Sequence, residues 1–145
     1  IRDSGGSATN IIADEVTLEA EARSHDDQSI NKQVKHMKET FETTANELGG
    51  QAEVLVEKSY PGFEVNETDK VTQYAISSAL ALGLKGDTCI AGGGSDGNIM
   101  NQYGIPSVIL GVGYENIHTT SERIAIKDMY MLTRQIIKII ELVAE

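Results

Sequence analysis

A change in the spacing of apolar residues constrains the fold of this chain more than any other feature. In residues 15–23 and 52–57 apolar and polar side chains alternate, which is typical of a half-buried strand. Between them, from Ile30 to Leu48, apolar residues recur every three or four positions, as on one face of a helix. Asp26 or Asp27 can cap this helix, and Gly49-Gly50 can end it. The order predicts a β-α-β lobe, with a sheet backed by one helix.

The pattern changes after the turn-forming break at residues 60–63. A helix is predicted over residues 71–82, short buried strands over 88–91 and 107–110, and a last helix with a broad apolar face from Thr119 onward. This half resembles part of an α/β layer. We therefore predict the α/β class, with one lobe over residues 1–63 and another over 64–145.

Composition limits the classes of partner. The chain has 145 residues, 40% of them hydrophobic, and a formal net charge of -10. That charge disfavours nucleic acid and anionic membrane surfaces, and no apolar stretch is long enough to cross a membrane. Small molecules or peptides fit better. The single Cys89, placed in a predicted buried strand, indicates a reducing, cytoplasmic compartment, and the start at Ile1 suggests an internal cut in a longer protein.

Residues 91–98 (AGGGSDGN) join a predicted strand to a helix through a glycine loop. The loop lacks the lysine of a P-loop and the spacing of a dinucleotide fingerprint, which disfavours nucleotide binding. Its backbone amides can hold a carboxylate or carbonyl oxygen. The alternative is a plain connection in which Ser95 or Asp96 caps the helix.

His118 can offer a ring nitrogen to a metal. A zinc site needs three or four ligands, and His25 and His36 show no ligand spacing with it, so this chain supplies at most one. The alternative is a hydrogen-bonded surface or cap histidine, because Thr119 and Glu122 have the spacing of a capping box at the start of a helix.

Two polar residues of the first lobe are candidates for substrate contact. Arg23 can clamp a substrate carboxylate with its planar guanidinium, or form a cross-strand ion pair with a glutamate. Asn10 can donate its amide to a ligand or shape a turn.

Four segments together resemble the dizinc exopeptidase family, which includes peptidase T, carboxypeptidase G and the acetylornithine and succinyl-diaminopimelate deacylases. They are residues 5–13 (GGSATNIIA), 20–24 (AEARS), 92–98 (GGGSDGN) and 118–122 (HTTSE). Within the family, the tripeptide aminopeptidases are the most similar. The resemblance covers essentially the whole chain, in the same order.

The resemblance implies an α/β catalytic domain that holds two zinc ions, interrupted by a β-α-β lid through which the enzyme dimerises. Residues 1–63 match the later part of the lid, and residues 64–145 match the C-terminal part of the catalytic domain. The other zinc ligands and the general base would precede Ile1, so this segment contains no catalytic residue and should be inactive alone.

Carried over residue by residue, the resemblance makes His118 the last zinc ligand and Glu122 a structural neighbour. Asn98 stands where some deacylases have an arginine for a second substrate carboxylate, which disfavours a diacid deacylase and is compatible with a peptide substrate. The implied substrate contacts are Asn10, Arg23, Gly93, Gly94, Ser95 and Asp96. The implied function is zinc-dependent hydrolysis of short peptides by a cytoplasmic homodimer. The alternative is a non-enzymatic module for small-molecule binding or dimerisation.

Overall fold

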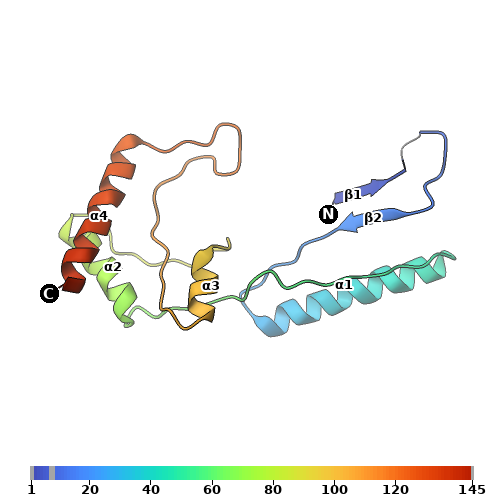
Figure 1. Ribbon diagram of the computed structural model, residues 1–145, viewed down its shortest axis with the longest axis horizontal. Coiled ribbons are helices and arrows are strands. Elements are labelled where there is room, and N and C mark those ends of the chain that lie inside the picture. Colours follow the sequence, from blue (N-terminus) through green and yellow to red (C-terminus); the bar gives the residue numbers. More distant parts are fainter. Residues whose placement is uncertain (1, 7–8, 145) are drawn as a thin grey trace. The chain divides into compact units, whose positions relative to one another are not determined.

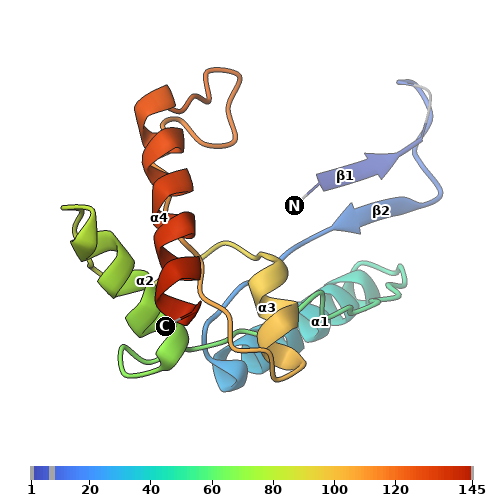
Figure 2. The same cartoon turned by 60° about the vertical axis from the view of Figure 1, so that its left-hand side comes forward.

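The computed structural model describes residues 2–6 and 9–144 and separates the chain into two compact units, Ile1–Gly62 and Phe63–Glu145. Figures 1 and 2 show the strands and the longest helix in the first unit and three shorter helices in the second. Strands and helices occur together, as the predicted α/β class requires. The assignment of the units to a lid and a catalytic domain stays a prediction.

The first unit contains a two-stranded antiparallel sheet. Strand β1 (Arg2–Gly5) pairs with β2 (Val16–Glu19), and Gly5 lies opposite Val16. The pairing of β1 was not predicted, and β2 is shorter than the predicted strand 15–23. β2 confirms that a strand forms within residues 15–23, but the predicted burial of one face is wrong, because Val16 and Leu18 are 55% and 47% exposed. Within the described residues of this unit, no helix packs against the sheet.

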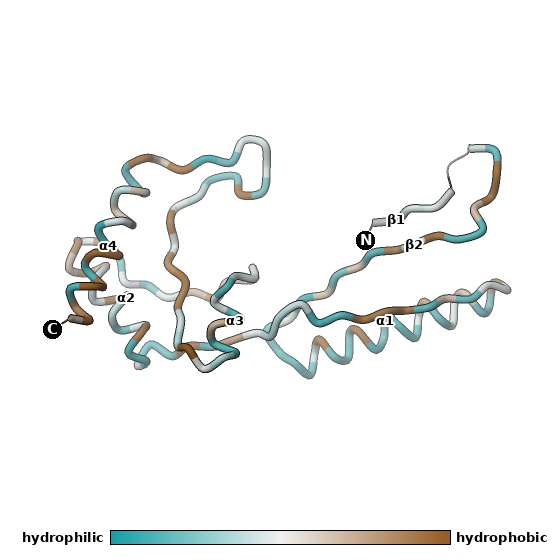
Figure 3. Tube along the Cα trace, in the orientation of Figure 1, coloured by the Kyte–Doolittle hydropathy of each residue, from teal (hydrophilic) through white to brown (hydrophobic). Residues whose placement is uncertain are grey.

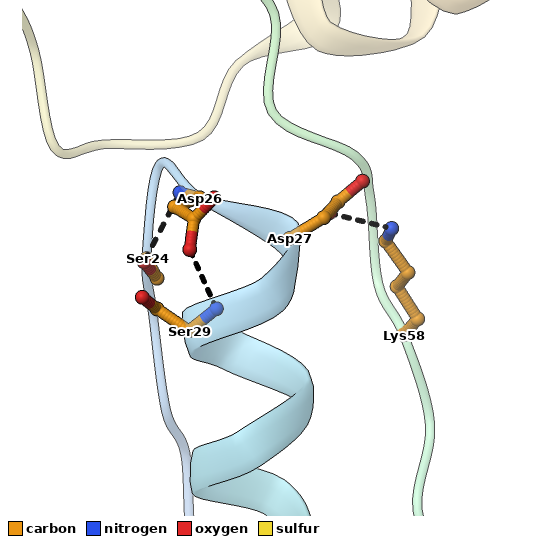
Figure 4. Close-up of polar contacts among 5 residues, drawn as sticks. All are labelled: Ser24, Asp26, Asp27, Ser29 and Lys58. Carbon is orange, nitrogen blue, oxygen red and sulfur yellow. Dashed lines mark hydrogen bonds and ion pairs between the residues drawn. The ribbon is translucent and has the colours of Figure 1, made fainter.

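Helix α1 (Asp27–Glu47) confirms the predicted helix and its cap. The Ser29 N–H donates to the Asp26 carboxylate at 2.6 Å, and the Asp26 N–H donates to Ser24 Oγ at 3.1 Å (Figure 4). These bonds satisfy N–H groups that have no partner within the helix. At the other end, Gly49 has a φ of +80°, which a glycine adopts without steric cost, so the helix ends there.

The predicted strand over residues 52–57 is wrong. Residues 50–66 have no regular secondary structure and pair with no strand in the described part of the chain, and Leu55 is 87% exposed. Lys58 Nζ lies 3.2 Å from Asp27 Oδ1, which connects this segment to the start of α1 (Figure 4). The first unit therefore has the order β-β-α. The strand that pairs with β2 is β1, which precedes it in the chain.

The second unit has its core between helix α2 (Lys70–Ala81) and helix α4 (Ile126–Ala144), which lie side by side in Figures 1 and 2. The buried residues of α2 are small, among them Ala75, Ser78 and Ala79. Small side chains let the two backbones approach closely. Gln135 of α4 is 9% exposed and donates to the Ala75 carbonyl at 3.2 Å, so a polar contact crosses this core.

Helix α4 begins at Ile126, so the prediction that the last helix starts at Thr119 is wrong. Figure 3 shows hydrophobic and hydrophilic residues alternating along it. Much of its apolar surface is exposed in this structure, including Ile137 at 52% and Ile140 at 63%. No helix within residues 2–6 and 9–144 has the length and hydropathy that crossing a bilayer requires.

The two short buried strands predicted for this unit are absent from the described residues. Residues 88–91 have no regular secondary structure and are exposed, with Ile90 86% exposed, so the prediction of a buried Cys89 is wrong. Residues 107–110 have no regular secondary structure and are partly buried. A strand requires hydrogen bonds to a neighbouring strand, and neither segment has such a partner here.

Candidate functional site

The glycine loop leads into helix α3 (Asp96–Gln102), whose start is defined by a capping box. Ser95 is the N-cap and its Oγ accepts from the Gly97 N–H at 3.2 Å. In the second bond of the box, Oδ1 of Asn98 accepts from the Ser95 N–H at 2.9 Å, and Asn98 is only 6% exposed. The predicted cap at Ser95 is confirmed. Two hydrogen bonds therefore fix the backbone where the loop becomes helical.

The loop itself is open. Gly93, Gly94, Ser95 and Asp96 are exposed, and a Cβ added to Gly93 would meet no atom within 4 Å. Gly97 differs, because a Cβ there would lie 2.7 Å from Ile109 Cδ1. Because Gly97 has no side chain, α3 can lie close to residues 107–110. The polar groups of the exposed loop before α3 are accessible to a ligand.

Asn101 connects α3 to the segment that follows Pro106. Its Nδ2 donates to the carbonyls of Gly97 at 2.8 Å and Ser107 at 2.9 Å, and its Oδ1 accepts from the Ser107 N–H at 3.1 Å. Reasoning from the sequence missed this residue. No local pattern marks it, because the contact depends on the chain turning back after Gly104, which has a φ of +75°.

His118 lies in an exposed loop and not at the start of a helix. Its φ is +64°, and that of Asn116 is +53°, both in the left-handed region that non-glycine residues rarely adopt. The His118 N–H donates to Glu122 Oε2 at 2.7 Å. The predicted capping box of Thr119 and Glu122 is wrong, because the glutamate accepts from His118 in a loop that turns back before α4 begins.

The His118 side chain suits one position of a zinc site. It is exposed, and in the described part of the chain its ring accepts and donates no hydrogen bond, so an imidazole nitrogen is available. Neutral imidazole is a common zinc ligand. Among the described residues no group of three or more His, Cys, Asp or Glu side chains could hold a metal. Further ligands would have to come from outside these residues.

The two candidates of the first unit are exposed. Asn10 lies in the turn between β1 and β2. Arg23 lies beyond the end of β2 and forms an ion pair with Glu21, which is near in sequence, so this pair is not the predicted cross-strand pair. The side-chain hydrogen bond between them lowers the pKa of Glu21 and raises that of Arg23. Because both groups face water, the pair is screened and can exchange for another partner.

None of the proposed site residues lines either of two surface hollows in the described part of the second unit. One, of about 520 Å³, is mainly apolar and lies beside α2 and α4, with Tyr74, Val108 and Ile139 in its wall. The other, of about 380 Å³, includes Glu64, Lys70 and Asn101. The candidate site is thus an exposed loop surface in this structure.

Known proteins are similar to this chain over nearly its full length. A crystal structure of a tripeptidase from Staphylococcus aureus subsp. aureus Mu50 is 62% identical with a TM-score of 0.88, and the match covers 99% of this chain and 38% of that one. The structure of aminopeptidase PepT from Bacillus cereus ATCC 10987 is 44% identical with a TM-score of 0.80, covering 99% and 39%. These likenesses bear out the α/β fold class.

A curated protein of Bacillus subtilis (strain 168), given as "Uncharacterized protein YqjE", is 42% identical over 140 residues, which is 97% of this chain and 38% of that protein. The chain therefore spans less than two fifths of the length of this relative. The model of peptidase family M20/M25/M40 matches residues 3–142. Because that match extends over almost all of the sequence, the chain belongs to peptidase family M20/M25/M40.

Proposed function

We propose that this chain is the C-terminal segment of a zinc-dependent exopeptidase that hydrolyses short peptides, in the manner of a tripeptide aminopeptidase. The observation that carries the proposal is the 62% identity, over 99% of the chain, to a protein whose crystal structure is described as a tripeptidase. Family membership over residues 3–142 agrees with it. The exposed apolar surface of α4 also supports it, because large exposed apolar patches normally mark contact with further protein.

In this proposal residues 1–63 are part of a lid and residues 64–145 are part of the catalytic domain. Asn10 and Arg23 of the lid orient the substrate, and Arg23 exchanges its solvent-exposed partner Glu21 for a substrate carboxylate. Gly93, Gly94, Ser95 and Asp96 line the substrate pocket, with the Ser95 capping box holding that loop in place. Cytoplasmic location belongs to the same proposal and rests on the sequence alone.

His118 provides one zinc ligand in this proposal, and its free, exposed imidazole supports that role. Zinc, when bound, would act as a Lewis acid that lowers the pKa of a zinc-bound water and polarises the scissile carbonyl of the substrate. A single imidazole does not retain zinc, so residues 1–145 alone are expected to be inactive.

The first unit is proposed to form the homodimer contact. Each strand of the described hairpin leaves one edge unpaired. An unpaired strand edge is a site where a second chain can add hydrogen bonds. Sedimentation of the full-length protein tests this, since a monomer at micromolar concentration would contradict it.

The test of function uses the full-length protein that contains this chain, prepared with zinc, and compares His118→Ala with His36→Ala. His36 is an exposed histidine on α1 with no proposed role, so it is the matched control. We expect the unaltered protein and H36A to cleave tripeptides and to bind equal zinc. H118A should lose about one zinc ion per chain and most of the activity. Absence of tripeptide cleavage in the unaltered protein would favour the non-enzymatic binding module instead.

A further inference from the structure

The loop that carries His118 is closed at its base by Glu115 and Arg123. Their backbones form an antiparallel bridge, with the Glu115 N–H donating to the Arg123 carbonyl at 2.9 Å and the reverse bond at 3.1 Å. Their side chains meet as well, since Arg123 Nε donates to Glu115 Oε2 at 2.7 Å and Nη2 contacts the same oxygen. The two ends of residues 115–123 are therefore held together independently of helix α4.

Inside this loop, Thr119 holds the turn that follows His118. The Thr119 hydroxyl donates to the Asn116 carbonyl at 2.7 Å and accepts from the Ser121 N–H at 3.2 Å. The Glu122 N–H donates to the Thr119 carbonyl at 3.1 Å. These contacts turn the chain so that the Glu122 side chain reaches back toward His118.

The contact between Glu122 and His118 has a specific consequence. The left-handed backbone of His118 is disfavoured for a residue with a Cβ, so it requires a contact that holds it. In the described part of the chain, the Glu122 carboxylate makes one hydrogen bond, to the His118 N–H at 2.7 Å. Because the backbone conformation fixes the direction in which the Cβ leaves the chain, this bond also sets the direction from which the imidazole extends.

We propose that Glu122 is a positioning residue for His118: its carboxylate holds the histidine in the left-handed conformation that directs the imidazole toward the metal. This inference rests on the proposed function, in which His118 is a zinc ligand. The Glu115–Arg123 bridge supports it by closing the loop. Residues that orient metal ligands contribute strongly to affinity, although they do not touch the metal.

The experiment measures zinc affinity by chelator competition in the full-length protein and compares Glu122→Ala, Glu122→Gln and Glu141→Ala. E122A should weaken zinc binding about 10- to 100-fold. E122Q should restore most of it, because the amide oxygen still accepts from the His118 N–H. Glu141 is the control, since it is an exposed glutamate that pairs with Lys138 on α4, and E141A should leave zinc affinity unchanged.

A second readout does not depend on metal. In zinc-free protein, the His118 amide should exchange with solvent faster in E122A than in the unaltered protein and in E122Q, while amides of α4 stay unchanged. A general structural defect would speed exchange throughout the second unit and would count against positioning. If E122A does not fold, Glu122→Asp takes its place. The shorter aspartate keeps the negative charge but moves the acceptor away from the His118 N–H, so E122D should weaken zinc binding.

The outcomes separate this inference from the proposed function. Unaltered zinc affinity in E122A, together with loss of zinc in H118A, would overturn the positioning role and leave the zinc site intact. Full zinc retention in H118A would overturn the proposed ligand and the positioning role with it. An E122Q variant as weak as E122A would also refute the inference, because it would show that charge matters and the acceptor contact does not.

Discussion

Replacement of Asn101 by alanine tests how the candidate substrate loop is held. Asn101 makes hydrogen bonds to the Gly97 carbonyl and to both the carbonyl and the N–H of Ser107, at 2.8, 2.9 and 3.1 Å. All are partly buried. Each such bond contributes on the order of 1 kcal/mol net, and alanine leaves the Ser107 N–H without its acceptor, so the local cost is about 2–3 kcal/mol.

The assay is amide hydrogen exchange at Ser107, whose N–H is one of the donors. A local cost of about 2–3 kcal/mol corresponds to exchange roughly 30- to 150-fold faster in N101A than in the unaltered protein. Asn101→Asp should give an intermediate rate, because a carboxylate still accepts from Ser107 but donates to neither carbonyl. Gln102→Ala is the control, as Gln102 is the exposed last residue of the same helix.

Two results would refute the reasoning. The first is an unchanged exchange rate of the Ser107 amide in N101A, which would mean that the loop after Pro106 is held by other contacts. The second is an equal effect of Q102A, which would attribute the change to the length of α3 and not to the side-chain bonds.

Two further predictions concern helix starts. Ser95→Ala should destabilise the start of α3 by about 1 kcal/mol and speed exchange of the Gly97 amide, whereas Ser77→Ala, an exposed change within α2, should leave that amide unaffected. Hydrogen bonds from the Ser29 side chain and N–H lower the pKa of Asp26 below its ordinary value of 3.8. The stabilising effect of the Asp26 cap is therefore complete above pH 3.8 and is lost as the pH falls through the lowered pKa. Exchange of the Ser29 amide, corrected for its intrinsic pH dependence, should therefore lose protection at acidic pH, and an Asp26→Asn variant that lost protection in the same way would contradict this.

The sequence alone determined the elements whose signals are local. Asp26 caps α1 and Gly49 ends it, and Ser95 caps α3, as predicted. A cap acts on N–H groups within one turn, and a left-handed glycine ends the helix next to it, so neither depends on distant parts of the chain. The family resemblance was equally readable, because four short motifs occur in the expected order.

A strand forms at residues 16–19 as predicted, but the strands predicted over 52–57, 88–91 and 107–110 do not form in the described part of the chain, because pairing is not local. Alternation over residues 52–57 resembles a strand, yet these residues have no paired neighbour among those described, while β1 pairs with β2 although nothing in its own residues predicted it. Alternation describes which faces a strand would present, and the partner is supplied by chain that lies elsewhere. The same reason explains why residues 88–91 and 107–110 form no strands in the described part of the chain.

The surroundings of His118 were decided by tertiary structure. The spacing of Thr119 and Glu122 fits a capping box, but Glu115 pairs with Arg123 and closes residues 116–122 into a loop, with Asn116 and His118 in left-handed conformations. Glu122 therefore accepts from the N–H of His118 instead of capping a helix. The sequence supplied the residue types for this contact. The bridge between Glu115 and Arg123, eight positions apart, decided which donor the glutamate meets. A hydrogen bond forms only where the backbone brings both groups within reach.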